Sequence, residues 1–243
     1  MDAVREARLD LAAALRLAAR FDMQEGICNH FSFMVPGRED CFLVNPQGLL
    51  WSEITASDLL LLGHDGSVIE GNGTPESTAF FIHWRIHRAV PHARAVLHTH
   101  MPYATAITSI AGGRIEPISQ NAVGRFGDRI AYDDEFNGFV LDESEGDRMA
   151  RALGNKSVLL LANHGVIVTG LDIATAFDDL YYLERTARNQ WLAAAMGRPL
   201  RVISPEIARK TAQQYGEGVN ELARPHFDAL KRLLDREEPQ YRD

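Results

Sequence analysis

Apolar residues recur every three or four positions through the first twenty residues of the chain. This spacing is typical of an amphipathic helix that packs one face on a core, and it predicts a helix over residues 2–22. We expect further helices over about 76–89, ending before Pro91, and over about 173–195, where Asp172 can cap the first turn. The apolar positions of the first helix are Val4, Ala7, Leu11, Leu15 and Ala18.

Shorter apolar runs, separated by turn residues, predict strands. "FSFMV" and "CFLVN" flank a turn at 36–40 and predict a hairpin. "ARAVLHTH" at 93–100 predicts a buried strand, and "SVLLLANHGVIVTG" at 157–170 predicts two strands that meet at Asn-His-Gly. This order of elements predicts one layered α/β domain over residues 1–243, with helices covering a mixed sheet and a helical C-terminal arm over about 197–243.

Composition and charge exclude several classes of function. Of 243 residues, 46% are hydrophobic and 24% are charged, which suits a soluble domain. The formal net charge of −8 is spread along the chain without a basic stripe, so we expect no nucleic-acid or membrane partner. Two cysteines, no signal-like start and no apolar run near the roughly 20 residues of a membrane helix favour a cytoplasmic location and a small-molecule substrate.

Two histidines, His98 and His100, end the predicted strand over 93–100. Side chains at i and i+2 of a strand point to the same face, so both imidazoles can reach one point. Zinc and iron(II) accept neutral imidazole, and a catalytic site usually has three protein ligands and an open position. His164 is the candidate third ligand, and Gly165 beside it would allow a close backbone approach. From spacing alone, two histidines that form hydrogen bonds inside the core remain the alternative.

The longer pattern resembles the class II aldolase and adducin family, nearer its adducin-like bacterial branch than the sugar-phosphate aldolases. The segments that carry the resemblance are "NHFSF", "VNPQGLLWSEITASDL", "PHARAVLHTHMPYATA", "LLLANHGVIVTG" and "AFDDLYYLERTA". It implies a three-layer αβα fold with a central mixed, largely antiparallel sheet, and a homotetramer. It also implies a divalent metal bound by His98, His100 and His164, with zinc expected first and iron(II) or manganese as alternatives.

The start of the predicted helix over 76–89 departs from the sugar-phosphate aldolases. Counting back from His98 and His83 places the aldolases' catalytic glutamate at Ala79. Alanine can neither bind a metal nor transfer a proton. Glu76 could replace it, although an acid at a helix start often only favours the helix dipole. Ser77 and Thr78 remain candidates for substrate binding.

Other predicted substrate contacts lie in two separate segments. Asn29 and His30 replace the small residues of the aldolases' phosphate loop, which puts a phosphorylated substrate in doubt. His30 could instead contact a carboxylate or phenolate. Tyr132 and Gln120 occupy the stretch where the aldolases bring a tyrosine across a subunit boundary, so Tyr132 is a candidate acid in the neighbouring site and Gln120 a candidate substrate contact.

Three more ionisable residues lie on predicted helices. Glu184 could accept an N–H from a ligand histidine, or form only a surface ion pair with Arg188. His83 and His87 lie one helical turn apart, a spacing that can bind metal. No further ligand is evident in the sequence, so packing or capping is favoured for this pair.

Together these features predict a metal-dependent lyase that cleaves or decarboxylates a small hydroxy or oxo compound through a metal-stabilised enolate. A non-haem-iron oxygenase on the same three histidines is an alternative, because a site without a carboxylate ligand leaves room for a bidentate substrate and dioxygen. A non-catalytic, adducin-like interaction protein is the other alternative.

Overall fold

The computed structural model describes residues 3–140, 142–216 and 219–243, and a sheet of eight strands lies at its centre. The strands are β1 (His30–Met34), β2 (Cys41–Val44), β3 (Leu60–Gly63), β4 (Val68–Glu70), β5 (Ala95–Thr99), β6 (Ile130–Asp133), β7 (Val158–Leu161) and β8 (Gly165–Gly170). Their order in the sheet is β4-β3-β2-β1-β5-β8-β7-β6. The pairing of β6 with β7 is parallel, and the other pairings are antiparallel. The predicted mixed, largely antiparallel sheet is therefore confirmed.

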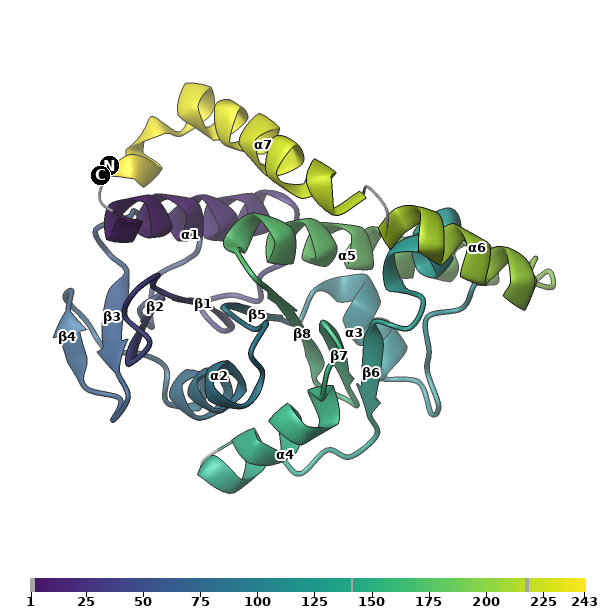
Figure 1. The fold of residues 1–243 in the computed structure, drawn as a ribbon, viewed down its shortest axis with the longest axis horizontal. Helices are drawn as coiled ribbons and strands as arrows, with labels where there is room; N and C mark the ends of the chain where they lie inside the picture. The colour runs from purple at the N-terminus through teal and green to yellow at the C-terminus, as the bar shows by residue number, and fades with distance from the viewer. Residues whose placement is uncertain (1–2, 141, 217–218) are drawn as a thin grey trace.

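Helices cover both faces of this sheet. The α-helices are α1 (Ala3–Arg20), α2 (Ser77–Ala89), α3 (Pro102–Thr108), α4 (Glu143–Leu153), α5 (Ile173–Ala195), α6 (Pro205–Gly216) and α7 (Ala223–Glu237), joined by the π-helix η1 (Ala122–Phe126) and the 3-10 helices η2 (Val219–Leu222) and η3 (Pro239–Arg242). Figure 1 shows α1, α5 and α7 on one side of the sheet and α2 and α4 on the other. This is the expected three-layer αβα arrangement. Within the described ranges, no helix combines the length and apolar character that crossing a bilayer requires.

Strand alternation divides the core between the two faces. Phe31, Phe33 and Leu97 pack with α1 and α5, whereas Val96 packs on the opposite side with α2 and α4. The even-numbered residues of β1 and β5 point to this second face, and they include the polar His30, Ser32 and His98. His30 lies directly opposite His98. The register therefore places a row of buried polar side chains under α2.

The predicted helices and strands agree well with the observed ones, with α2 and α5 beginning within one residue of the expected positions. The sequence pattern does not predict β6, η1 or α4. The last of these buries only a narrow stripe against α2, and a Cβ at Gly146 would lie 2.3 Å from the carbonyl oxygen of Phe81. The buried positions of α4 recur every three or four residues, but only Met149 and Leu153 among them are large apolar residues, so the helical signal in the sequence is weak.

Candidate metal centre

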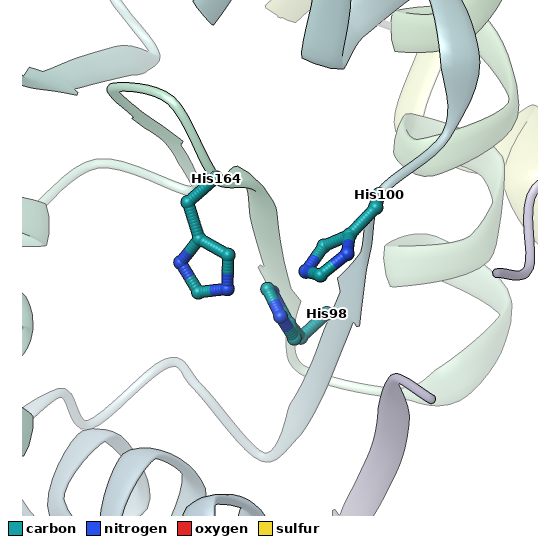
Figure 2. Close-up of side chains that lie close together, drawn as sticks. All are labelled: His98, His100 and His164. Atoms are coloured by element: carbon teal, nitrogen blue, oxygen red, sulfur yellow. The ribbon is translucent and has the colours of Figure 1, made fainter. Parts of the chain in front are cut away.

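The three predicted ligands, His98, His100 and His164, converge at one edge of the sheet. His98 lies in β5, His100 directly follows this strand, and His164 lies in the turn between β7 and β8. One potential ligand atom from each residue lies within 4.8 Å of the others. Figure 2 shows the three rings turned toward a common point. The cluster therefore has the geometry of a three-histidine metal site.

The turn that carries His164 approaches the end of β5 closely because residue 165 is glycine. A Cβ there would lie 2.6 Å from the carbonyl oxygen of Thr99 and 2.7 Å from Cδ2 of His100, distances that real Cβ atoms do not adopt. Asn163 enters the left-handed region with φ of 55°, which asparagine tolerates better than most residues. The close approach that the sequence predicts for Gly165 is thus present.

Nδ1 donates a hydrogen bond in both His98 and His100, and in a neutral ring this leaves Nε2 as the nitrogen with a free lone pair. Nδ1 of His98 donates to the carbonyl oxygen of Val166 at 3.0 Å, and Nδ1 of His100 donates to the carboxylate of Glu25. Nε2 of His100 is buried and has no hydrogen-bond partner among the described residues. A buried lone pair without a donor is costly, and a divalent cation would satisfy it. The residues present therefore fit a metal ion.

Burial keeps the imidazoles of His98 and His164 neutral. Desolvation, and then the neighbouring His164 ring, holds the pKa of His98 well below its usual range. Desolvation, and then His100, lowers the pKa of His164 to about 4. Since metals bind the neutral form of imidazole, both rings are in the binding form at neutral pH.

Asn29 and Glu184, two residues with predicted roles near the ligands, both contact backbone groups. The side chain of Asn29 is buried and its Oδ1 accepts a hydrogen bond from the backbone N–H of His100 at 3.3 Å. Asn29 itself adopts a left-handed conformation with φ of 74°, which turns this amide toward β5. This hydrogen bond positions a candidate ligand histidine, and the substrate-binding role of Asn29 remains a prediction.

The second of these residues, Glu184, contacts the backbone of the segment that follows His100, and its predicted contact to a ligand histidine remains a prediction. Its two carboxylate oxygens accept hydrogen bonds from the N–H groups of Tyr103 and Ala104, at 2.8 and 2.9 Å. It therefore stabilises the start of α3, directly after the histidine pair. The carboxylate that bonds to a ligand is Glu25, which sequence reasoning missed because it lies 75 positions before His100 in an irregular segment.

A cavity of about 550 Å³ opens beside the histidine cluster, and His100 and His164 are among its lining residues. One part of its lining is apolar and includes Ile82, Phe136 and Phe139, and another part is polar and includes Thr78 and Asn163. The described lining residues include no lysine or arginine. Such a pocket suits a ligand with an apolar part and a few polar groups, and it offers no side-chain cation for a phosphate.

The remaining predicted site residues divide into those near the cavity and those away from it. Thr78 lines the cavity, whereas Ser77 is exposed at the start of α2 and Gln120 is exposed before η1. Tyr132 lines a separate cavity, where its hydroxyl accepts a hydrogen bond from the N–H of Ile115 at 3.1 Å. The roles of Tyr132 and Gln120 across a subunit boundary therefore remain predictions.

Glu76 and His30 lie together at the start of α2. The Glu76 carboxylate caps this helix by accepting from the N–H of Ala79 at 3.1 Å, and it also accepts from the hydroxyl of Thr78. One of its oxygens lies 3.5 Å from Nε2 of the buried His30. Ala79 is buried one helical turn before His83, on the same face of α2. Glu76 is thus a helix cap that also reaches a histidine beside the metal centre.

Known proteins resemble this chain over nearly its whole length. Residues 9–191 match the family described as "Class II Aldolase and Adducin N-terminal domain". The decarboxylase NovR of Streptomyces niveus is 35% identical over 230 residues, covering 92% of this chain and 84% of the relative. A 4-hydroxy-3-prenylphenylpyruvate oxygenase/4-hydroxy-3-prenylbenzoate synthase of Streptomyces roseochromogenus subsp. oscitans is 35% identical over 208 residues, covering 84% of this chain and 74% of the relative. The crystal structure of an aldolase II superfamily protein from Pseudomonas syringae superposes with a TM-score of 0.92 at 36% identity, covering 100% of this chain and 97% of the other. The chain therefore belongs to the class II aldolase and adducin family.

Proposed function

We propose that this protein is a metal-dependent lyase that cleaves or decarboxylates a small hydroxy or oxo acid or carbonyl compound. The observation that carries the proposal is the buried, unpartnered Nε2 of His100, set among the described residues beside the ring nitrogens of His98 and His164. A divalent metal bound there would supply a Lewis acid that polarises a carbonyl and stabilises an enolate. The similarity to a decarboxylase over most of both chains supports the same class of reaction.

The cavity lining supports a substrate that is not phosphorylated and that has an apolar or aromatic substituent. Phe136 and Phe139 would pack against this substituent and exclude water from one side of the site. The hydroxyl of Thr78 and the amide of Asn163 would orient its polar end. The oxygenase relative is named for an aryl oxo acid, which agrees with this substrate class.

We propose Glu76 as the proton carrier in place of the acid missing at Ala79. Its carboxylate reaches the hydroxyl of Thr78, which lines the cavity, and it lies beside His30. Zinc as the resident metal and a homotetramer as the assembly belong to the same proposal. In such a tetramer Tyr132 would act as an acid, and Gln120 as a substrate contact, in a neighbouring pocket.

The proposal is tested by loading the protein with zinc, manganese or iron(II) and supplying a panel of hydroxy and oxo acids with and without aryl groups. We expect release of carbon dioxide or an aldehyde from at least one unphosphorylated member. His98→Ala should abolish this release, and His64→Ala, at an exposed histidine outside the site, should retain it. A protein that binds these metals but releases neither product from any member would contradict the lyase.

An oxygenase is the second candidate, because a relative of 35% identity carries that name. In this case iron(II) and substrate together would consume dioxygen, and removal of dioxygen would stop turnover. Turnover that continues without dioxygen would exclude the oxygenase and leave the lyase. A protein that retains no metal and turns nothing over would instead fit the non-catalytic, adducin-like role.

A further inference from the structure

A continuous line of hydrogen bonds runs beside the metal centre through residues that are not its candidate ligands. Nδ1 of His30 lies 2.6 Å from Nε2 of His83, and Nδ1 of His83 lies 2.5 Å from Oγ of Ser32. The same Oγ lies 2.7 Å from Nε2 of His87, whose Nδ1 lies 2.6 Å from the carbonyl oxygen of Ala93. We call His30, His83, Ser32 and His87 the histidine chain. It links β1 to α2, and each of its members is buried.

The hydrogen bond between His87 and the carbonyl oxygen of Ala93 determines which nitrogen of each ring carries a hydrogen. A carbonyl oxygen only accepts, so Nδ1 of His87 must carry a hydrogen. Burial lowers the pKa of His87 to about 4, so the ring is neutral and its Nε2 must accept from the hydroxyl of Ser32. This hydroxyl has a single hydrogen, and its oxygen can therefore only accept from Nδ1 of His83.

The ring hydrogens of His83 and His30 are assigned in the same way. Burial holds the pKa of His83 well below its usual range, so His83 is neutral and its Nε2 accepts from Nδ1 of His30. A neutral imidazole carries one ring hydrogen, and in His30 this hydrogen lies on Nδ1. Nε2 of His30 is left as an acceptor at the end of the chain.

The surroundings of this nitrogen favour the opposite tautomer. Nε2 of His30 lies 3.5 Å from an oxygen of Glu76 and 3.5 Å from Oγ1 of Thr78, whose hydroxyl already donates to Glu76. A hydrogen on Nε2 would be attracted to the carboxylate, so an isolated His30 would favour the Nε2–H form. In the Nδ1–H form of a neutral His30, two acceptors, Nε2 and the carboxylate, instead face each other beside Thr78, which lines the cavity.

We propose that Ser32, His83 and His87 are positioning residues that hold His30 in the Nδ1–H tautomer, so that His30 and Glu76 form a paired acceptor for a ligand hydroxyl group. An anionic group of the ligand is disfavoured at this end of the cavity, because neither acceptor supplies a hydrogen. The identity of the ligand rests on the proposed lyase, and within its substrate class the paired acceptor favours a compound that carries a hydroxyl group. The tautomer does not depend on that function.

Ring-nitrogen NMR of protein labelled with 15N-histidine tests the proposal directly, on metal-stripped protein and after zinc is restored. Single His30→Gln, His83→Gln and His87→Gln variants assign the signals. We expect His30, His83 and His87 each to carry hydrogen on Nδ1. In Ser32→Ala the link between His83 and His87 is lost, and we expect a signal for hydrogen on Nε2 of His30 together with zinc affinity within about twofold of the parent.

Ser157→Ala is the matched control, because Oγ of Ser157 is also buried but has no hydrogen-bond partner among the described residues. It should leave all three histidine signals unchanged. Hydrogen on Nε2 of His30 in the parent protein, or an unchanged His30 in a folded Ser32→Ala variant, would overturn the proposal. If Ser32→Ala fails to fold, the position of the His30 ring hydrogen in the parent spectra tests the proposal without the variant. The spectra need no substrate, so failure of the lyase assay and failure of this inference are distinguishable.

Discussion

At the scale of single residues, Glu25 affects the metal centre through one hydrogen bond to Nδ1 of His100. This bond fixes the tautomer of a candidate ligand and raises the basicity of its Nε2. We expect Glu25→Gln to weaken zinc binding by roughly 10-fold or more, as loss of such partners usually does. Competition with a chromogenic chelator measures this affinity.

The control for this prediction is Glu39→Gln, which removes the same charge at an exposed position in the turn before β2. It should leave zinc affinity unchanged. Equal affinity in the Glu25 and Glu39 variants would mean that the observed contact contributes nothing to metal binding.

The sequence identifies the candidate metal ligands better than the residues that support them. Strand periodicity and the family motifs predict His98, His100 and His164, which the structure brings together. The contacts of Glu25 and Asn29 to His100 join irregular segments more than 70 positions away, and no local pattern encodes them. The His83–His87 spacing is visible in the sequence, but its meaning depends on partners in β1 that only the sheet register supplies.

At the scale of elements, the metal centre depends on how closely the β7–β8 turn packs on the end of β5. Gly165→Ala would place a Cβ 2.6 Å from the backbone oxygen of Thr99. Since a backbone atom cannot rotate away, we expect a loss of about 1 to 3 kcal/mol in the free energy of unfolding and weaker zinc binding. Urea denaturation and chelator competition measure the two effects.

Gly216→Ala provides the matched control for the same substitution. A Cβ at Gly216 would meet no atom of the described residues within 4 Å, and the residue ends α6. This variant should keep full zinc affinity and equal or higher stability, because alanine favours helix. Unimpaired zinc binding in Gly165→Ala would show that the turn does not need its close approach.

Elements with strong local signals are predicted well, whereas those defined by long-range packing are not. The strands and turn that carry the three histidines have apolar runs bounded by turn residues, and they appear where expected. Strand β6 is half-buried and pairs at the sheet edge, and η1 is a single π-helical segment, so neither has a long periodic pattern. The role of Glu184 is missed for the same reason, because its partners are backbone groups of another helix.

At the scale of the whole molecule, buried neutral histidines make stability depend on pH. The pKa of His87 is lowered to about 4 by burial, so between about pH 6.5 and 4 the unfolded chain binds a proton there that the folded chain does not. The metal-free protein should therefore lose stability as the pH falls below 6.5. This one histidine accounts for roughly 3 kcal/mol by pH 4.

Urea denaturation of the parent and His87→Gln between pH 8 and pH 5 checks this effect. At pH 8 histidine is neutral in both states, so the difference there gives the cost of lost packing and hydrogen bonds alone. As the pH falls, the variant should lose stability less steeply than the parent. Parallel curves would mean that His87 does not stay neutral in the folded protein.

The central claim is that His98, His100 and His164 bind one divalent metal through imidazole nitrogen. X-ray absorption at the zinc edge of the zinc-loaded protein tests it most directly, because it reports the ligands without requiring activity. The account predicts one zinc per chain with scattering from three imidazoles at about 2.0–2.1 Å, lost in His100→Ala. A sulfur shell at about 2.3 Å, fewer than two imidazoles, or zinc that does not survive gel filtration would contradict it.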